Sequence, residues 1–197
     1  MIHRGAIIVV MASLPDAPLT EEQYLAIERL AEFKSEFHDG LMFAMEGSSV
    51  NHALLSTRVG ALLYQQVPAG SRVFDPGLRI KVASAGLYTY ADCSVVCGDL
   101  ETFSDQKDVL LNPLLIVEVL SPSTEGYDRG KKFELYRTIP SFQEYVIVHQ
   151  DRRHVEHYSK QDDGSWLLRD HADGEVAIAR LGVHIALADL YASAIGL

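Results

Sequence analysis

Residues 113–120 read PLLIVEVL, and this stretch decides the fold. Its side chains are apolar without alternation except for Glu118, which is typical of a strand buried on both faces at the centre of a sheet. A helix is expected to start within Ser121-Pro122-Ser123-Thr124 and to run to about Thr138, because Pro140 cannot continue it. Residues 144–149 (EYVIVH) again indicate a buried strand. Residues 114–149 therefore predict a strand–helix–strand unit with a right-handed crossover.

Two helices are expected before this unit. Thr20-Glu21-Glu22-Gln23 is a capping box, and apolar residues at helical spacing behind it predict a helix over residues 20–33. Ser48 or Ser49 is expected to cap a second helix, which ends before Pro68.

Strand signals lie between and after these helices. Asp39-Gly40 separates strand-like runs at 36–38 and 41–43, a pattern that favours a β-hairpin. Residues 72–82 and 87–96 are β-branched, aromatic and partly alternating, and each run is expected to form one strand.

The last part of the chain predicts a β meander. Its strand-like runs are residues 154–159, 166–169 and 176–179, separated by Asp-Gly turns. A short helix from Leu187 is expected to finish the chain.

Composition excludes several classes of protein. The 197 residues include 17 Lys+Arg and 27 Asp+Glu, a net charge of −10, and 48% are apolar. We expect one globular domain over residues 18–197, preceded by a flexible extension at residues 1–17. The acidic balance argues against nucleic-acid binding by bulk charge, since that binding depends on Lys and Arg neutralising phosphates. Any nucleic-acid role would have to be local, transient or assisted by a metal.

The cellular location is expected to be the cytoplasm. The apolar run at residues 6–12 is far shorter than the ~20 residues that a membrane-spanning helix needs, so no membrane role is expected. Cys93 and Cys97 are four residues apart on one predicted strand, too far for a disulfide. Two free thiols fit a reducing compartment.

Two carboxylates on strands indicate a metal site. Glu118 interrupts the buried apolar run, and a buried carboxylate without a partner costs several kcal/mol. Asp92 lies in a second β-rich stretch, and the two carboxylates converge if these strands are neighbours. Converging carboxylates favour a hard divalent ion such as Mg²⁺. The alternative is that Glu118 lies at the open end of its strand and faces solvent or an arginine.

The helix after Glu118 adds a third element. Asp128, Lys132 and Tyr136 are spaced by four residues and lie along one stripe of that helix. Lys132 can therefore reach back towards Glu118 with an ammonium group of the kind that phosphodiester cleavage needs. The alternative is a surface ion pair between Asp128 and Lys132, which contributes little. Lys131 is expected to face water.

The segment from Val117 to Tyr136 has the pattern VEVLSPST-x3-D-x3-K-x3-Y. Together with upstream Glu36, His52 and Asp92, it resembles the Uma-type restriction endonuclease family, a branch of the PD-(D/E)xK nuclease superfamily. The resemblance covers nearly the whole chain after about residue 18. It implies an α/β (α+β) fold with a restriction endonuclease-like core, in which helices flank a mixed central sheet, here with the C-terminal β meander added.

The resemblance also implies roles for individual residues. Asp92, Glu118 and the backbone carbonyl of Val119 would hold Mg²⁺ (or Mn²⁺), and Lys132 would orient the attacking water or steady the phosphorane. Glu36 resembles the upstream acidic residue of the family. By that resemblance, Glu36 would either bind a second metal ion or support the residues that bind the first.

Three further features qualify these roles. His52 matches a family histidine that would touch substrate or a metal water, although a capping or packing role is equally open. The chain has Ala91 where the superfamily has proline, and Leu120 where it has lysine. Lys132, on the following helix, resembles the migrated lysine of the family.

The leading hypothesis is therefore a Mg²⁺-dependent endonuclease that hydrolyses DNA, acting as a homodimer since closed dimers are the commonest oligomers. Six basic residues would line a local groove: Arg58, Arg72, Arg79, Lys81, Arg129 and Lys131. The alternative is a weak or inactive nuclease-fold protein that binds a protein or nucleic-acid partner.

Other chemistries have little support. A glycosidase would need paired carboxyls in a sugar-sized cleft. Ser121 and Ser123 do not lie in a nucleophile elbow. His154 and His157 are expected on opposite faces of one strand, where they cannot share an ion.

Overall fold

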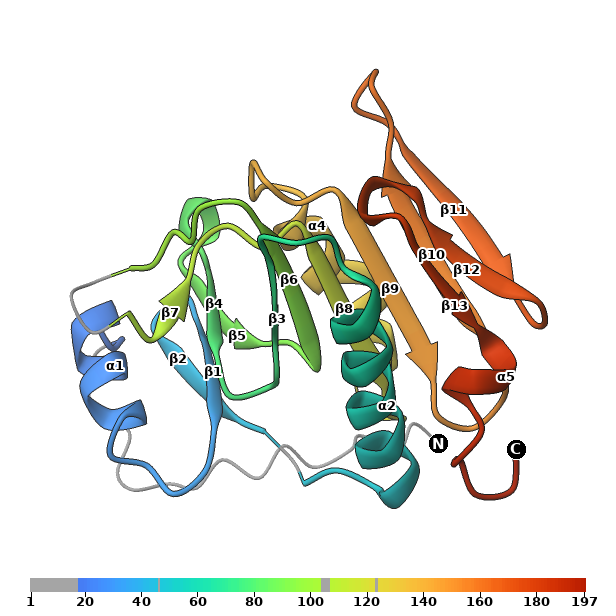
Figure 1. Ribbon diagram of the computed structural model, residues 1–197. Helices are drawn as coiled ribbons and strands as arrows, with labels where there is room; N and C mark the ends of the chain where they lie inside the picture. Colours follow the sequence, from blue (N-terminus) through green and yellow to red (C-terminus); the bar gives the residue numbers. More distant parts are fainter. Residues whose placement is uncertain (1–17, 46, 104–106, 123) are drawn as a thin grey trace.

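The computed structural model describes residues 18–45, 47–103, 107–122 and 124–197 (Figure 1). Its largest sheet has six strands in the order β11-β10-β9-β8-β6-β3. They are β3 (Ser71–Phe74), β6 (Cys93–Cys97), β8 (Leu115–Leu120), β9 (Glu144–His149), β10 (Val155–Lys160) and β11 (Trp166–His171). β8 runs parallel to β9 and antiparallel to β6. The predicted strand–helix–strand unit is confirmed, with β8 inside the sheet.

Two smaller sheets accompany the large one. A five-stranded sheet has the order β2-β1-β5-β4-β7, and β12 pairs with β13 in a third sheet. The five strands are β1 (Ser35–His38), β2 (Leu41–Ala44), β4 (Arg79–Val82), β5 (Leu87–Tyr90) and β7 (Val109–Leu110), and the third sheet consists of β12 (Glu175–Ile178) and β13 (Val183–Ala186). The β1–β2 hairpin turns at Asp39 and Gly40, both at positive φ, as the Asp-Gly signal predicts.

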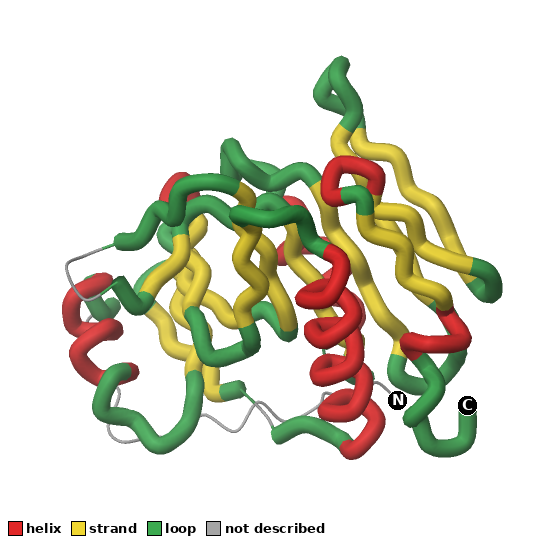
Figure 2. Tube along the Cα trace, viewed as in Figure 1, coloured by secondary structure: helices red, strands yellow, loops and turns green. Residues whose placement is uncertain are grey.

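Helices are few and mostly short (Figure 2). Three separate helices are α1 (Glu21–Glu28), α2 (Val50–Gln66) and α5 (Leu187–Leu190). After β8, one continuous helical segment consists of α3 (Glu125–Tyr127), the π-helical turn η2 (Asp128–Lys132) and α4 (Phe133–Tyr136). Single 3₁₀ turns, η1 (Ala83–Ala85) and η3 (Ala179–Leu181), precede β5 and β13. Ser49 caps α2 and Thr20 caps α1 with the full capping box. None of the helices in the described part of the chain is long and apolar enough to span a bilayer.

Strand alternation gives the large sheet two cores. Val117 and Val119 of β8 pack towards Leu55 and Val59 of α2 and towards the β12–β13 hairpin. Ile116 and Leu120 point to the opposite face, where Phe133 and Tyr136 of α4 cover the sheet. Because side chains alternate along a strand, Glu118 shares this face with Ile116 and Leu120, and its side chain is directed towards η2 and α4.

Two predicted strands are each split between sheets. Residues 72–82 form β3 and β4, interrupted by a turn in which the Gly77 N–H donates to Asp75 Oδ1 at 2.7 Å and Pro76 supplies no N–H. Residues 87–96 form β5 and β6, separated at Ala91 and Asp92. The prediction of single strands was wrong, because period-two patterning does not report which sheet a strand joins.

Helix α1 and the C-terminal strands also differ from the sequence predictions. α1 ends at Glu28 rather than at residue 33, and the exposed Leu30 and Phe33 beyond it have no core to pack on. β12 does not continue the meander of β9, β10 and β11. It pairs instead with β13, because Val176 and Val183 are buried against the α2 face of the large sheet. The predicted extension at residues 1–17 lies outside the described residues.

Candidate active site

Glu118 is buried in the middle of the large sheet. It belongs to β8, which β6 and β9 flank, and only 4% of its surface is exposed. Its Oε1 accepts a hydrogen bond of 2.9 Å from the Tyr136 hydroxyl of α4. The open-strand-end alternative, in which Glu118 faces solvent, does not hold.

Lys132 is the cation that meets Glu118. Its Nζ lies 3.0 Å from Glu118 Oε1, 3.2 Å from Glu36 Oε1 and 3.4 Å from Asp128 Oδ1. Lys132 and Asp128 are 4% and 3% exposed, so their pair belongs to the interior and is not the surface pair that the sequence left open. Three carboxylates thus surround one ammonium.

The helical segment that carries Lys132 has an unusual turn. Residues Asp128–Lys132 form a π-helical turn between α3 and α4, a local widening that is frequent at functional sites. Tyr145 of β9 supports it by donating from its hydroxyl to the Asp128 carbonyl at 3.1 Å. Lys131 is half exposed, as predicted, and its Nζ lies 3.4 Å from Glu134 Oε1.

Asp92 reaches the same end of the sheet from β6. It lies one position before Cys93, which pairs with Val117 of β8. Its Oδ2 accepts a 2.7 Å hydrogen bond from the Val119 N–H and lies 3.4 Å from His52 Nε2 of α2. The main chain of β8 therefore holds the Asp92 carboxylate beside Glu118.

Burial and neighbouring charges control the protonation of these groups. Burial raises the pKa of Glu118 to about 8; Lys132 opposes this rise, whereas Asp128 and Asp92 add to it. Burial lowers the pKa of Lys132, but the charge of Glu118 and its other acidic neighbours outweighs this effect, so the pKa lies well above its usual range. Burial likewise lowers the pKa of His52, and the hydrogen bond and charge of Asp92 raise it above the ordinary value.

Glu36 and His52 come from elements far from Glu118 in sequence. Glu36 lies on β1, the first strand of the predicted hairpin, and its Oε1 also accepts a hydrogen bond from Thr89 of β5. The His52 side chain faces Asp92, while its N–H donates to the capping Ser49. Thr89 was missed, because nothing in the sequence distinguishes it from other strand threonines.

Comparisons with known proteins identify the family of this chain. The family described as "Uma2: Putative restriction endonuclease" matches residues 21–190. The chain belongs to this family. The predicted resemblance is therefore confirmed, and membership supports a nuclease-like function acting on nucleic acid.

Similar proteins to this Uma2-family chain include two uncharacterized proteins of Synechocystis sp. One is 36% identical over 187 residues, which cover 92% of this chain and 97% of the relative. The other is 37% identical over 155 residues, which cover 77% and 86%. A solved structure described as a putative nuclease belonging to DUF820 from Anabaena variabilis has a TM-score of 0.71 at 19% identity, covering 89% of this chain and 98% of that one. That likeness confirms the mixed α+β fold.

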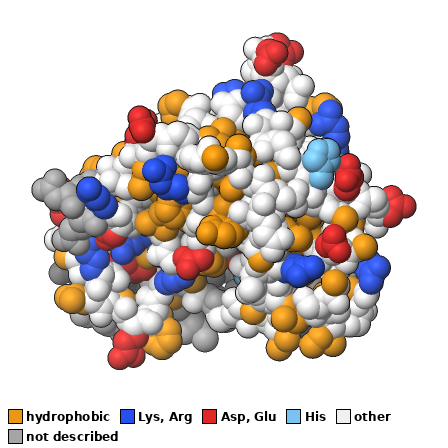
Figure 3. Space-filling view, viewed as in Figure 1, with side chains coloured by type: hydrophobic (Ala, Val, Ile, Leu, Met, Phe, Trp, Pro, Cys, Tyr) orange, Lys and Arg blue, Asp and Glu red, His pale blue; other side chains and the backbone are white. Residues whose placement is uncertain are grey.

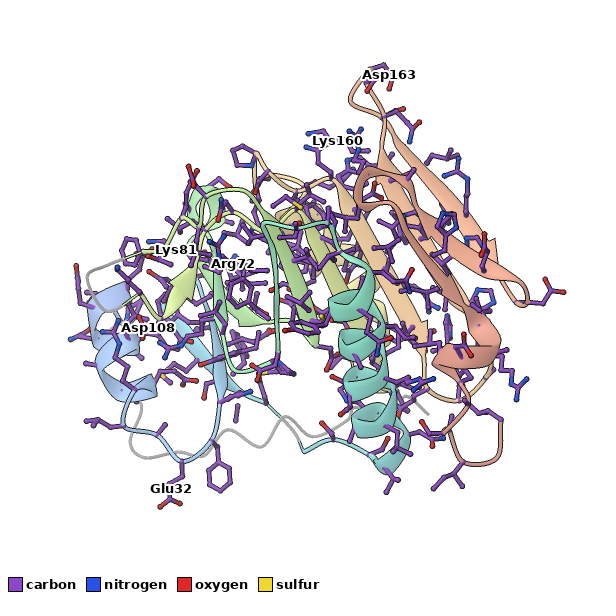
Figure 4. All side chains as sticks on the ribbon, viewed as in Figure 1. Glu32, Arg72, Lys81, Asp108, Lys160 and Asp163 are labelled. Atoms are coloured by element: carbon purple, nitrogen blue, oxygen red, sulfur yellow. The ribbon has the colours of Figure 1, made fainter. Side chains whose placement is uncertain are left out.

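The predicted basic groove is wrong for this Uma2-family protein. Arg79 pairs with Asp108 at 3.3 Å and Lys81 with Glu21 at 2.6 Å, and both basic side chains are buried. Arg72 donates to a backbone carbonyl. Figure 4 shows Arg72 and Lys81 on different strands, and Figure 3 shows the basic side chains of this face scattered rather than gathered.

A second group of ligand-type residues has its own cation. Within the described ranges, His149, His154 and Glu156 bring three potential ligand atoms within 4.8 Å of one another. Arg129 pairs with Glu156 and lies 2.8 Å from His149 Nε2, so a guanidinium already neutralises this group. His157 points elsewhere and meets Glu144 at 2.8 Å. His154 and His157 therefore do not share a site, as predicted.

Proposed function

We propose that the protein is a divalent-metal-dependent endonuclease that hydrolyses DNA phosphodiester bonds, with Asp92, Glu118 and the Val119 carbonyl as metal ligands. Family membership supports a nuclease-like activity. The observation that carries the proposal is the position of Glu118: the Lys132 ammonium lies 3.0 Å from its Oε1, and the next residue of β8, Val119, holds the Asp92 carboxylate through its N–H.

The residues present fit a hard divalent ion. Three carboxylates, those of Glu36, Glu118 and Asp128, surround the ammonium of Lys132. The charge of Asp92 also acts on Glu118, so this buried region carries an excess of negative charge. Asp128 Oδ1 is buried and, within the described part of the chain, has no hydrogen-bond partner, although it lies 3.4 Å from the Lys132 ammonium. Oxygen donors of this kind suit Mg²⁺ or Mn²⁺. Such an ion, when bound, polarises the scissile phosphate and lowers the pKa of water.

The chain's own residues position the reacting groups. The Val119 N–H holds Asp92, and the Tyr136 hydroxyl holds Glu118, so neither carboxylate must reorganise when substrate arrives. The Lys132 ammonium supplies a point charge for the negative charge that develops on the phosphorane. Glu36 Oε1 orients that ammonium, so a role of Glu36 as metal ligand would rest on its other oxygen. His52 lies beside Asp92, where it can contact substrate.

The test is a cleavage assay with matched variants. Purified protein with Mg²⁺ or Mn²⁺ should nick supercoiled plasmid or cut single-stranded circular DNA, and EDTA should stop the reaction. Asp92→Asn, Glu118→Gln and Lys132→Ala should abolish cleavage, whereas Lys131→Ala, one position along the same helical segment, should not. Cleavage that survives both carboxylate changes would refute the assignment.

A second candidate function is a non-catalytic binding module with the same fold. The described surface favours it, because Arg79 and Lys81 are buried in ion pairs, Arg72 donates to a backbone carbonyl, and the basic side chains of the face in Figure 3 are scattered rather than gathered into a patch. Thermal unfolding separates the two functions. An ion that binds the native state raises the transition by mass action, by about 2.7 kcal/mol at one hundred times its dissociation constant. A protein that no longer holds metal shows no shift with Mg²⁺ or Mn²⁺.

The homodimer and the cytoplasmic location stay predictions. Light scattering coupled to size-exclusion chromatography tests the first, and fractionation of cells that express the chain tests the second.

A further inference from the structure

A groove of about 930 Å³ opens beside the candidate active site. Helix α2 lines it from His52 to Tyr64, and Phe33, in the loop after α1, lines it as well. Asp92 and Phe74 also line it. Between His52 and Tyr64, α2 presents only small side chains: Ala53, Ser56, Thr57, Gly60 and Ala61. The groove therefore leads along α2 directly to a proposed metal ligand.

Exposed aromatic side chains border this groove. Phe33 is 77% exposed and Tyr64 is 76% exposed, and they come from different elements, the loop after α1 and helix α2. Large apolar groups with this exposure, placed together around one groove, indicate a surface that meets a partner. Neither side chain supports the fold by packing.

Charge restricts what the groove can accept. Among the described residues that line it are the acidic Glu32, Asp75 and Asp92, the titratable His52 and one lysine, Lys34, whose Nζ already donates to the Pro76 carbonyl at 2.7 Å. Figure 4 shows Glu32 pointing away from the body of the protein. Tight binding of a duplex depends on several Lys or Arg residues neutralising phosphates, and the walls of this groove do not supply them. Uncharged base faces, in contrast, stack on aromatic side chains without any cation.

We propose that the groove binds an unpaired nucleic-acid strand, whose bases stack on Phe33 and Tyr64 while one phosphate reaches Asp92. The inference rests on the proposed nuclease function and names its substrate class: single-stranded, flapped or locally opened nucleic acid. The volume lies within the range that encloses small organic ligands and admits a few nucleotides at most. A recognised strand would be held by its bases, and the bound ion would meet its phosphate.

The experiment measures binding separately from cleavage. Fluorescence anisotropy with Mg²⁺ compares labelled oligonucleotides of one sequence as single-stranded DNA, single-stranded RNA and DNA duplex, in the Glu118→Gln background where hydrolysis is not expected. Phe33→Ala and Tyr64→Ala should each weaken single-strand binding about fivefold or more, and roughly 20-fold or more together. Phe43→Ala is the matched control, since Phe43 is an exposed aromatic residue of β2 outside the groove.

The outcomes separate this inference from the proposed function. Single-strand binding that depends on both aromatic residues supports the inference, even if the wild-type protein cuts nothing. Equal affinity for the single-stranded DNA and RNA oligonucleotides indicates recognition of the bases, while tighter binding of one of them indicates a contact to the sugar. Equal binding of the duplex, no binding of any oligonucleotide, or single-strand binding unchanged in the double variant overturns the inference. A wild-type dimer that the double variant dissociates also overturns it, because the groove would then be a subunit interface.

Discussion

Replacement of Lys132 by methionine tests the electrostatics of the site most directly. The change keeps the length of the side chain but removes an ammonium that three carboxylates contact at 3.0–3.4 Å. At an effective dielectric constant of about 20, one such pair attracts by roughly 5 kcal/mol, and desolvation of each ion offsets several kcal/mol of that attraction. Removing one partner of a buried pair leaves the others uncompensated. We therefore expect Lys132→Met to lower the free energy of unfolding by about 3–5 kcal/mol.

The assay is urea unfolding at neutral pH with EDTA, so that no metal replaces the lost charge. Lys131→Met is the matched control, because its ammonium is half exposed and pairs only with Glu134 at 3.4 Å. Such a surface pair contributes about 0.2–1 kcal/mol. Glu118→Gln added to Lys132→Met should recover part of the loss, since it removes one of the uncompensated carboxylates.

The pH dependence supplies a second check with a definite sign. Lys132 lowers the pKa of Glu118, so its removal lets burial raise that pKa beyond about 8. A carboxyl whose folded pKa is raised costs stability as pH rises from its unfolded value to its folded value, and the loss levels off above the folded value. Wild type and Lys132→Met should therefore lose stability alike up to about pH 8, and the deficit of the variant should grow from about pH 8 to pH 9, where only the variant still loses stability. A deficit within about 1 kcal/mol of the Lys131→Met value at every pH would refute the reasoning.

Three further predictions follow from individual contacts. Tyr136→Phe deletes the hydroxyl that donates to the buried Glu118 Oε1, and urea unfolding should show a loss of about 1–3 kcal/mol, with no loss meaning that the bond is not formed in solution. Burial raises the pKa of Glu156, but hydrogen bonds headed by that of Arg129 lower it to about 2, so up to ~3 kcal/mol of stability should disappear as pH falls from about 4.5 towards 2. Glu156→Gln should flatten this acid limb, and an unchanged slope would contradict the assignment. Ser49→Ala removes the N-cap of α2 and should cost about 1 kcal/mol, while a thermal midpoint equal to the wild type would show the cap to be dispensable.

The sequence predicted the centre of the fold because the signals there are local. An unbroken apolar run of strand length predicts β8 wherever it lies, and the four-residue spacing of Asp128, Lys132 and Tyr136 places them on one helical stripe. The contact between Lys132 and Glu118 could be predicted because the helix that carries Lys132 begins shortly after the end of the strand that carries Glu118. The π-helical turn within that segment carried no sequence signal that we recognised.

Sheet membership could not be predicted in the same way. Two alternating runs each looked like one strand, but Pro76 and Asp92 lie at points where the chain leaves one sheet for another. Period-two patterning reports which residues face a core and not which core they face. The basic groove failed for a related reason, since Arg79 and Lys81 are paired with acidic residues from distant elements.

The sequence alone determined the buried strand with its single carboxylate, the hairpin at Asp39 and Gly40, and the helical stripe that presents Lys132. Only the tertiary structure decided that Glu36 meets Lys132, that Thr89 donates to Glu36, that β8 holds Asp92, and that a groove with aromatic borders opens beside Asp92. The physical reason is range. Periodicity and capping act over a few neighbouring residues, whereas a contact between Glu36 and Lys132 exists only after chain segments nearly one hundred residues apart have packed together.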